Sequence, residues 1–558
     1  MKKVLIALLV LAGLAVAVFF YLRDRKLTDF EPQLIEKISG LVHDATNGLY
    51  QLDISSLEVD VLNARVTLFN ARLSPDSSVL ARLDSLRRAP NEVFFLEVDR
   101  LNIEGIDPSL LVETSVIDLD TLLITKPRIR IYHTHREYND ALPVDTTPID
   151  QLILKDMDRI KLNRLLIQDA DLEHYNVTQD KKMAIQKVTV DIQDILIDSA
   201  SVLDTTRILF AKDAQVRFED YVYSTPDSVY NIMVGGVFIS AAKKDLELSN
   251  VALKPRVSRQ QFVKQQKEVK ELYTLNFKKV VLNEINWWSL LNDQILFAES
   301  AELSNGNLEV YCNRSLPPFS GSKVGNYPHQ ALMKLPIDLH IKEMTISNFD
   351  IEYEEYNPNS KKAGVLSFSN ASGKLTNVTN NIAIIERNPL MVANARASLM
   401  GKAAIQATFT FNLARHKEGI FSVDMSMGKM DGTTLNTVTE PLGMFSVKSL
   451  NIQSINSRIN GSDYRGNGRV TILYDDLKIV PLKQDDEEGL KERGFLGFLA
   501  NTFVVKSDNV KGDKQRITNP VYTRETSKSF FALIWKTLLT GILEAVGAPP
   551  ALAKPKED

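Results

Sequence analysis

Alternation of apolar and polar residues with a period of two runs through most of this chain. Leu101 and Ile103 alternate with polar neighbours in one segment, and Val470 and Ile472 do the same in a later one. Successive side chains of an extended strand point to opposite faces, so each such strand has one apolar and one wet face. Antiparallel sheets commonly have this form. The pattern therefore predicts a mainly β protein.

The chain also resembles itself at an offset of 180 residues. Leu68 and Asn70 fall on Leu248 and Asn250, and further coincidences follow in the same order along the chain. Later in the two copies, LLIQDADLEHYN (165–176) resembles MTISNFDIEYEEYN (344–357). Self-similarity of this kind indicates a repeat architecture. We expect two repeats and a shorter third copy, at residues 48–227, 228–407 and 408–482.

The N-terminal 26 residues predict a membrane anchor. An uncharged run from Val4 to Leu22 follows two lysines, and its length is close to the roughly 20 residues that cross a bilayer core. Ala15–Ala17 offers a cleavage site, but the apolar run continues beyond it. We therefore expect an uncleaved single-pass signal anchor. Its membrane-contact candidates include Phe19, Phe20 and Tyr21.

Helical periodicity predicts an amphipathic helix at 27–47 and another within the C-terminal segment 527–558. The first places Phe30, Leu34, Ile38 and Leu41 at helical spacing. The second could cap the sheet, which we favour, or lie in a membrane interface with three aromatic side chains buried. These further membrane-contact candidates are Phe530, Phe531 and Trp535. Residues 483–526, which precede the C-terminal segment, read as a solvated linker or loop.

The C-terminal helix is expected to be two-sided. Its apolar side should include Phe531, Ile534, Trp535, Leu538, Ile542 and Val546, and its polar side Lys536, Thr540 and Glu544.

The segment RIRIYHTHRE (128–137) offers a possible metal site. His133, His135 and Glu137 would share one strand face, and two imidazoles with a carboxylate can bind a metal. The second copy has Cys312, Arg314 and Leu316 at the corresponding positions. We therefore interpret the first copy as a strand whose face begins apolar and turns polar at its end, and we expect no metal site.

No sequence signature of an enzyme stands out. The chain lacks a phosphate-binding glycine loop, a Gly-x-Ser-x-Gly elbow and a His-Glu-x-x-His helix. Its net charge of −4, without a dominant basic block, gives no support for nucleic acid binding. Cys312 is the single cysteine, so no disulfide within the chain is possible. We expect no catalytic residues and no cofactor.

A long sheet with one apolar face needs a cover for that face. The predicted helices are too few to cover it. Either the sheet folds into a sandwich, or it curls into an elongated trough whose apolar face stays open to an apolar ligand. The candidates for the lining of such a groove are Leu68, Leu101, Ile103, Ile129, Ile131, Val188, Val190, Leu248, Leu282, Ile346, Ile351, Val470 and Ile472.

These features together resemble a known family. An N-terminal anchor, an amphipathic helix, repeated strands such as LLITKPRIRIY and a late GNGRVTILYDDLKI segment look like AsmA-like proteins of the repeating β-groove, bridge-like lipid transfer superfamily. The resemblance covers roughly residues 1–482. It implies a curled antiparallel β-groove in the periplasm, anchored in the inner membrane, that binds phospholipid or another acyl lipid.

The resemblance further implies a part in lipid transfer and outer-membrane lipid homeostasis, with envelope proteins as possible partners. A second hypothesis stays open. The chain could be a non-catalytic envelope scaffold or outer-membrane assembly factor, with its apolar face closed as a β core and no lipid inside.

Overall fold

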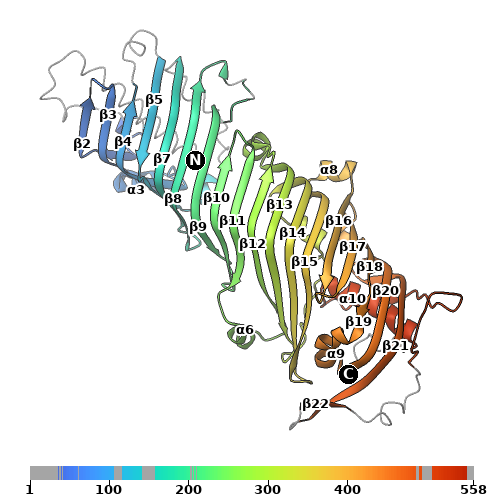
Figure 1. Cartoon of the computed structure of the whole chain (residues 1–558). Coiled ribbons are helices and arrows are strands. Elements are labelled where there is room, and N and C mark those ends of the chain that lie inside the picture. The colour runs from blue at the N-terminus through green and yellow to red at the C-terminus, as the bar shows by residue number, and fades with distance from the viewer. Residues whose placement is uncertain are drawn as a thin grey trace. The chain divides into compact units, whose positions relative to one another are not determined.

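The computed structural model places the chain in two compact units (Figure 1). It describes residues 46–548 except 61, 106–115, 141–157, 202–203, 205, 209, 486–488 and 493–504, together with 35–36, 39–40 and 42–44. Unit 1 comprises residues up to Tyr223 and Val234–Leu248, and unit 2 comprises Ser224–Met233 and the chain from Ser249 onward. The predicted membrane anchor lies outside the described residues.

Strands dominate unit 1, as the alternation predicts. They are β1 Tyr50–Asp53, β2 Ser56–Asp60, β3 Arg65–Pro75, β4 Glu92–Glu104, β5 Val116–Thr125, β6 Arg128–His133, β7 Arg159–Asn176, β8 Lys181–Ile197 and β9 Ala211–Ser224. Two short helices join them, α3 Ser77–Ser85 and the 3-10 helix η1 Glu137–Asn139. Strands β10 Tyr230–Ser240 and β11 Asp245–Pro255 have residues in both units.

Unit 2 continues with long strands. They are β12 Glu271–Asn283, β13 Ile295–Asn313, β14 Asp338–Asn357, β15 Lys362–Thr379, β16 Leu390–Leu399, β17 Ala403–Asn412, β18 Phe421–Met427, β19 Met430–Asp431, β20 Phe445–Gly461, β21 Arg465–Asp485, β22 Gly489–Glu492 and β23 Val521–Thr523. The helical segments are α6 Arg259–Gln265, the π-helix η3 Ser289–Asp293, α7 Pro328–Leu332, α8 Ile382–Arg387, η4 His416–Glu418, η5 Gly432–Leu435, α9 Asn436–Gly443 and α10 Phe530–Val546.

Strand pairing is mostly antiparallel, but each unit also contains parallel pairing, which the alternation did not predict. In unit 1, β5 and β6 both run parallel to β7. In unit 2, β13 runs parallel to β14 over nearly its whole length. Parallel neighbours need a long crossover connection. Residues 134–158 and 314–337 provide these connections, and they are the longest links between consecutive strands in the two units apart from the stretch that follows β22.

The 180-residue offset also appears in the backbone. Asn70 and Asn250 both adopt positive φ, near +50°, in the middle of β3 and β11. Asp169 in β7 and Asn348 in β14 do the same, 179 residues apart. Asparagine and aspartate tolerate this left-handed conformation better than other residues with a Cβ atom. The two copies therefore share strand irregularities as well as side chains.

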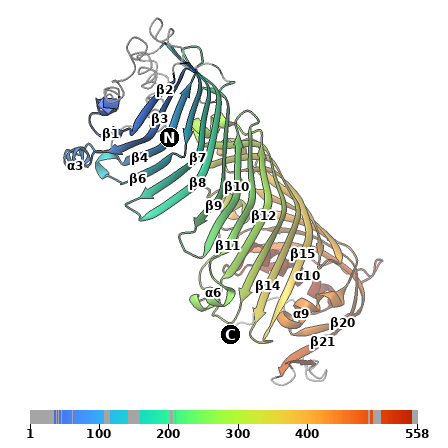
Figure 2. The same cartoon turned by 60° about the vertical axis from the view of Figure 1, so that its left-hand side comes forward.

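The C-terminal helix α10 packs on the sheet in unit 2, as favoured above (Figure 2). The expected apolar side is confirmed for Leu538, which is buried, and for Ile534, Ile542 and Val546, which pack against the same core cluster. It is wrong for Phe531 and Trp535, which are exposed, and the packed side also includes Thr537, Thr540 and Gly541. Small residues occupy this side of the helix because its backbone lies close to the sheet. A Cβ atom on Gly541 would lie 2.8 Å from Val470, so only a small residue lets the helix reach β21.

The segment expected to be a linker also belongs to the sheet of unit 2. Within residues 483–526, β22 and β23 both pair with β21. Asn509 is almost fully buried, and its side-chain amide donates to the carbonyl oxygen of Ile472 at 2.6 Å. These contacts cover the edge of β21, which would otherwise present unpaired backbone groups.

A buried ion pair ties the 314–337 crossover to the C-terminal part of unit 2. Arg524 and Asp463 are each about 1% exposed in their side chains, and their charged groups lie 3.3 Å apart. Gln330, on α7, donates to the second carboxylate oxygen of Asp463 at 2.8 Å. Arg524 also donates to the carbonyl oxygen of Lys323 and lies over the ring of Tyr327. This cluster fixes three segments that are distant in sequence.

We predict that Arg524→Met strongly destabilises unit 2. The substitution leaves the Asp463 carboxylate buried without its cation, which typically costs about 3–5 kcal/mol. Arg415→Met is the matched control, because Arg415 pairs with Glu418 where both side chains are about half exposed, and such pairs contribute about 1 kcal/mol or less. Urea unfolding of both variants measures the difference. Equal destabilisation would contradict the assignment of Asp463 and Arg524 as a structural pair.

We also predict a pH dependence that arises from His329, beside the same cluster. His329 is fully buried, and neither ring nitrogen has a hydrogen-bond partner among the described residues. Burial lowers its pKa to about 4, with Asp463 opposing the shift and His416 adding to it. Between pH 6.5 and 4 the unfolded chain therefore binds this proton more readily than the folded chain, and stability falls as the pH falls.

The expected loss over this range is about 3 kcal/mol, since one pKa unit corresponds to about 1.4 kcal/mol. His329→Phe should remove that part of the pH dependence, whereas His135→Gln, at an exposed site, should keep it. Urea unfolding at pH 7 and pH 4.5 gives the comparison. The same pH slope in His329→Phe and the unaltered chain would refute the prediction.

Candidate functional site: a half-buried apolar sheet face

Rows of apolar side chains cross the strands of unit 2 on one face. One row joins Leu275, Leu308, Ile351, Phe368 and Leu399, which lie opposite one another on β12 to β16. The first four are half-buried, and Leu399 is buried at 9% exposed. Side chains in a closed core are usually shielded more completely than this. The face is therefore apolar and partly open to solvent along β12 to β15.

Two parallel rows extend this surface along the strands. Val280, Leu303 and Ile346 form one, and Tyr273, Val310, Tyr353 and Leu366 form the other. All are half-buried except Tyr273, which is 39% exposed. We call these three rows, on β12 to β15, the open apolar face.

Helices cover the ends of the apolar strands near β20 and β21. Helix α10 packs Leu538 and Ala545 into one cluster with Val470, Ile472 and Tyr474. Helix α9 lies against β15, where a Cβ atom on Gly364 would be 2.6 Å from Leu442. The apolar face is therefore covered at β20 and β21 and covered in part at β15, where Leu366 and Phe368 pack against the same cluster.

In unit 1, a single row of apolar side chains changes from fully buried to half-buried along its length. Leu68, Leu101 and Ile124 lie opposite one another on β3 to β5 and are 0–1% exposed. The row continues through Ile167, Val190 and Val216 on β7 to β9, and these three are half-buried. Ile35 and Val42, from the helical residues after the predicted anchor, pack into the buried part. The apolar face of unit 1 is thus closed at β3 to β5 and opens toward β8.

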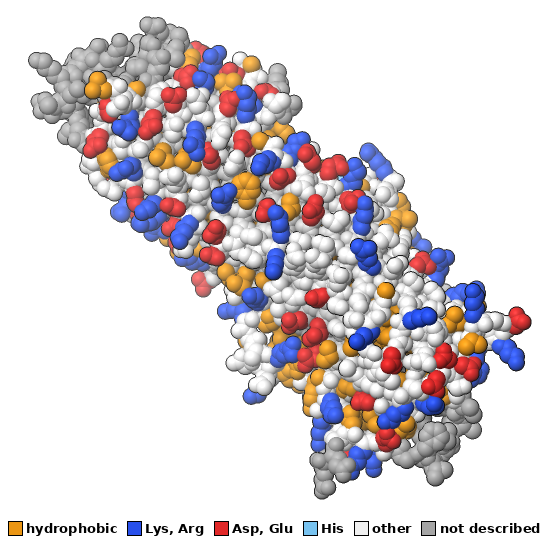
Figure 3. All heavy atoms as spheres, in the orientation of Figure 1, with side chains coloured by type: hydrophobic (Ala, Val, Ile, Leu, Met, Phe, Trp, Pro, Cys, Tyr) orange, Lys and Arg blue, Asp and Glu red, His pale blue; other side chains and the backbone are white. Residues whose placement is uncertain are grey.

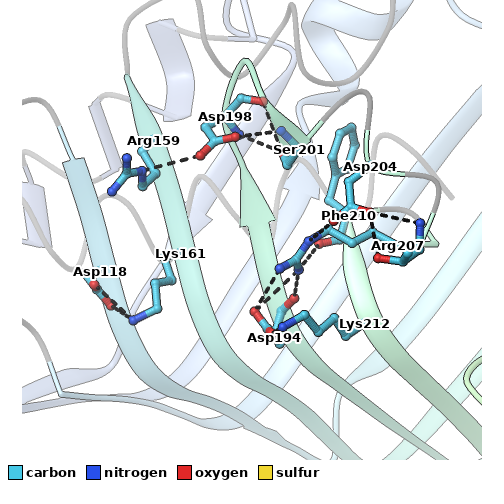
Figure 4. Close-up of polar contacts among 11 residues, drawn as sticks. Asp118, Arg159, Lys161, Asp194, Asp198, Ser201, Asp204, Arg207, Phe210 and Lys212 are labelled. Atoms are coloured by element: carbon cyan, nitrogen blue, oxygen red, sulfur yellow. Dashed lines mark hydrogen bonds and ion pairs between the residues drawn. The ribbon is translucent and has the colours of Figure 1, made fainter.

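A polar network fixes the connection between β8 and β9 beside this closed core (Figure 4). Arg207 is 6% exposed and lies between the carboxylates of Asp194 and Asp204, both at 3.3 Å. Lys212 pairs with the same Asp194 at 2.6 Å. The network holds Phe210 against the core cluster. It is therefore a structural clamp at the connected ends of β8 and β9, where Ile195, Ile197 and Ala211 are buried in the core.

The open apolar face ends in polar side chains along β13 and β14. Cys312 lies opposite Glu271 on one side and Glu355 on the other. Glu355 is buried and accepts from the Tyr353 hydroxyl at 2.5 Å and pairs with Arg314 at 2.7 Å. Burial raises the pKa of the Cys312 thiol to about 11, which keeps it protonated at neutral pH. This rim is paired and charged, and the thiol there is not activated.

The corresponding end of unit 1 carries His133. Ile129 and Ile131 on β6 are half-buried on the apolar face, and His133 follows them at the last position of the strand, opposite Glu92. His135 and Glu137 lie beyond β6, and Glu137 begins the 3-10 helix η1. The expectation that all three share one strand face is therefore wrong for His135 and Glu137, because β6 ends first. Across the described residues, no group of three or more His, Cys, Asp or Glu side chains is arranged to hold a metal ion.

The thirteen groove candidates divide into two sets. Those in closed cores, 0–8% exposed, are Leu68, Leu101, Ile103, Leu282, Val470 and Ile472. Those that are half-buried are Ile129, Ile131, Val188, Val190, Leu248, Ile346 and Ile351. Only the second set leaves surface for a ligand, so the closed-core residues do not fit the expected role.

Of the membrane-contact candidates, Phe530 does not fit that role. It is 5% exposed and packs against Tyr327, Phe411 and Phe421. Phe531 and Trp535 are 64% and 52% exposed, and their contact with a membrane stays a prediction. Phe19, Phe20 and Tyr21 lie outside the described residues. No helix in the described part of the chain is long and apolar enough to span a bilayer.

Strict period-two alternation along β14 would not place both groove candidates of that strand, Ile346 and Ile351, on one face. Ile346 and Ile351 are five positions apart, which would put them on opposite faces of a regular strand. They share a face because Asn348 adopts a φ of +51° and shifts the register between them. The signal available in the sequence is a short polar residue inside an apolar strand. After that residue the apolar side chains move from even-numbered to odd-numbered positions.

Comparison with known proteins does not assign the chain to a family. No family model matches it, and no curated protein matches its sequence significantly.

Proposed function

We propose that this chain is a membrane-anchored, periplasmic lipid-binding and transfer protein whose apolar sheet face shields acyl chains. The observation that carries the proposal is the open apolar face. Three rows of aliphatic and aromatic side chains lie in register on β12 to β15, and most of them are half-buried, whereas α10 covers the apolar face at β20 and β21 of the same unit. A large accessible apolar surface usually marks a binding site.

The proposed mechanism is passive and needs no covalent step. Each methylene group of an acyl chain that leaves water for an apolar surface contributes about 0.8 kcal/mol. A lipid tail lying along the three rows would gain this free energy over many methylene groups. Its polar head group would stay in solvent beyond the open apolar face, where the strands end in charged residues such as Glu271 and Arg314.

The predicted N-terminal anchor and the resemblance to AsmA-like proteins support a place in the inner membrane. A protein held there, with its apolar face in the periplasm, could accept lipid from one membrane and contribute to the lipid homeostasis of the outer membrane. Envelope proteins are possible partners in that role.

A scaffold function is the second candidate, and the closed cores favour it. Leu101 and Ile103 are fully buried in unit 1, and α10 closes the sheet near β21 in unit 2. If no ligand occupies the open apolar face, the apolar positions of the alternating strands would serve mainly to form these closed cores. The protein would then act in outer-membrane assembly without binding lipid.

Lipid extraction from the purified full chain, followed by mass spectrometry, tests the two candidates. We expect co-purified phospholipid in the unaltered chain. Ile351→Asp places a charge in the middle of the open apolar face and should reduce loading and fluorescent phospholipid binding at least tenfold, because a carboxylate beside acyl chains is poorly solvated. Ile351→Leu keeps an apolar side chain of the same volume and should bind normally.

Ser347→Asp is the matched control, since Ser347 is exposed on the same strand and the substitution adds the same charge on the opposite face. Circular dichroism establishes that each variant folds. Absence of lipid from the unaltered chain, or normal loading of folded Ile351→Asp, would rule out the lipid-binding proposal.

A further inference from the structure

The opposite face of the same sheet in unit 2 carries a polar hollow of about 1070 Å³. It extends from β14 to β21, and its lining residues form two rows that cross the strands. The first row runs from Thr345 on β14 through Asn394 to Arg469 on β21, and the second from Ser372 on β15 through Gln406 to Thr471. We call this feature the polar trough.

The geometry of the polar trough fits an extended chain. Its rows are two residues apart along each strand, which corresponds to about 7 Å. Between them, Gly373, Ala395 and Ala407 place their backbone at the floor, because their positions face the apolar side. Six strand spacings separate β14 from β21, which gives a length of roughly 29 Å. The trough is therefore long, narrow and shallow.

Charge in the polar trough has the opposite sign from the chain. Lys374, Arg396, Arg458 and Arg469 line it with a single carboxylate, Asp424, which gives a net charge of +3, whereas the whole chain carries −4. Asp424 pairs with Arg458 at 2.5 Å, and Lys374 pairs with Glu343, beside the trough on β14, at 2.7 Å. Arg396 donates to the Ser372 hydroxyl at 2.9 Å. Neither Arg396 nor Arg469 forms an ion pair with another described residue, so both guanidinium groups can bind an anion.

The remaining side chains of the two rows are hydroxyl and amide groups, while Ile346, Ala395, Ala407 and Met425 contribute apolar atoms to the floor between the rows. None of the lining side chains is aromatic. Serine, threonine, asparagine and glutamine both donate and accept hydrogen bonds, which suits a ligand with many hydroxyl groups. Guanidinium groups bind carboxylate and phosphate in a two-pronged geometry. The absence of aromatic side chains disfavours single-stranded nucleic acid, whose bases stack on aromatic rings.

We propose that the polar trough binds a linear acidic polysaccharide, with sugar hydroxyls along the two polar rows and carboxylate or phosphate groups on Arg396 and Arg469. In Figure 3 this face of unit 2 shows a broad area of uncharged polar side chains and backbone between scattered charged groups. The polar trough and the open apolar face lie on opposite sides of the sheet. The proposal therefore holds whether or not the apolar face binds lipid.

Fluorescence anisotropy with the purified full chain tests the proposal. The probes are labelled hexagalacturonate, which carries carboxylates, and an oligomannose bearing phosphate groups; the tighter one identifies the anion. Labelled maltohexaose is the neutral comparison and should bind at least tenfold more weakly than the better acidic probe. Arg396→Gln combined with Arg469→Gln should weaken the acidic probe at least tenfold.

The control replaces two other cations in the same unit. Lys402, in the turn between β16 and β17, and Lys417, on η4, are exposed and lie outside the polar trough. Lys402→Gln with Lys417→Gln removes the same charge and should change affinity less than twofold. Circular dichroism establishes that both double variants fold.

Four results would overturn the proposal. They are no binding of either acidic probe, equal binding of maltohexaose, equal weakening by the two double variants, and tighter binding of a single-stranded oligouridine of the same charge. The last result would assign the polar trough to nucleic acid.

Discussion

One constraint organises this molecule: a sheet that is apolar on one face must have that face covered or occupied. The chain meets it differently along its length. Residues after the predicted anchor close the face at β3 to β5, and α10 closes it at β20 and β21. Over β12 to β15 the same kind of surface stays half-buried. The open part is thus defined by where the covering segments stop.

Strand irregularities are the second organising feature. Single residues with positive φ, such as Asn70, Asn250 and Asn348, interrupt the regular backbone of long strands. At Asn348 the register with β15 shifts, and an irregularity of this kind bends and twists a strand locally. Such residues recur at a nearly constant offset in the two copies, which suggests that they belong to the repeat as much as its apolar residues do.

Much of the architecture follows from local pattern. Period-two alternation is enough to predict strands, because it depends on residues close in sequence, and the self-similarity predicts that such segments recur along the chain. Burial depends on which distant segment lies above a residue. Ile103 and Ile351 have similar local patterns, yet one is fully buried and the other half-exposed. The sequence around Ile103 contains no trace of the segments that cover it.

The polar side of the sheet illustrates the same limit. Arg396 and Arg469 are 73 positions apart and each reads as an ordinary solvated residue on a wet face. Pairing of the five strands β16, β17, β18, β20 and β21 brings them into neighbouring rows of one trough. The parallel pairing of β13 with β14 was likewise hidden, because it depends on how the 314–337 connection returns and not on the strands.

The buried pair of Asp463 and Arg524 has a consequence for synthesis. Arg524 binds the carbonyl oxygen of Lys323, which leaves the ribosome 201 residues earlier. Chains fold progressively as they are made, and exposed apolar surface on incomplete chains promotes aggregation. Until Arg524 and α10 emerge, the end of the sheet at β20 and β21 lacks its cover and the 314–337 crossover lacks its tether. A nascent chain of this protein therefore stays open at β20 and β21 until Arg524 and α10 have been synthesised, and its apolar surface there is exposed to aggregation during that interval.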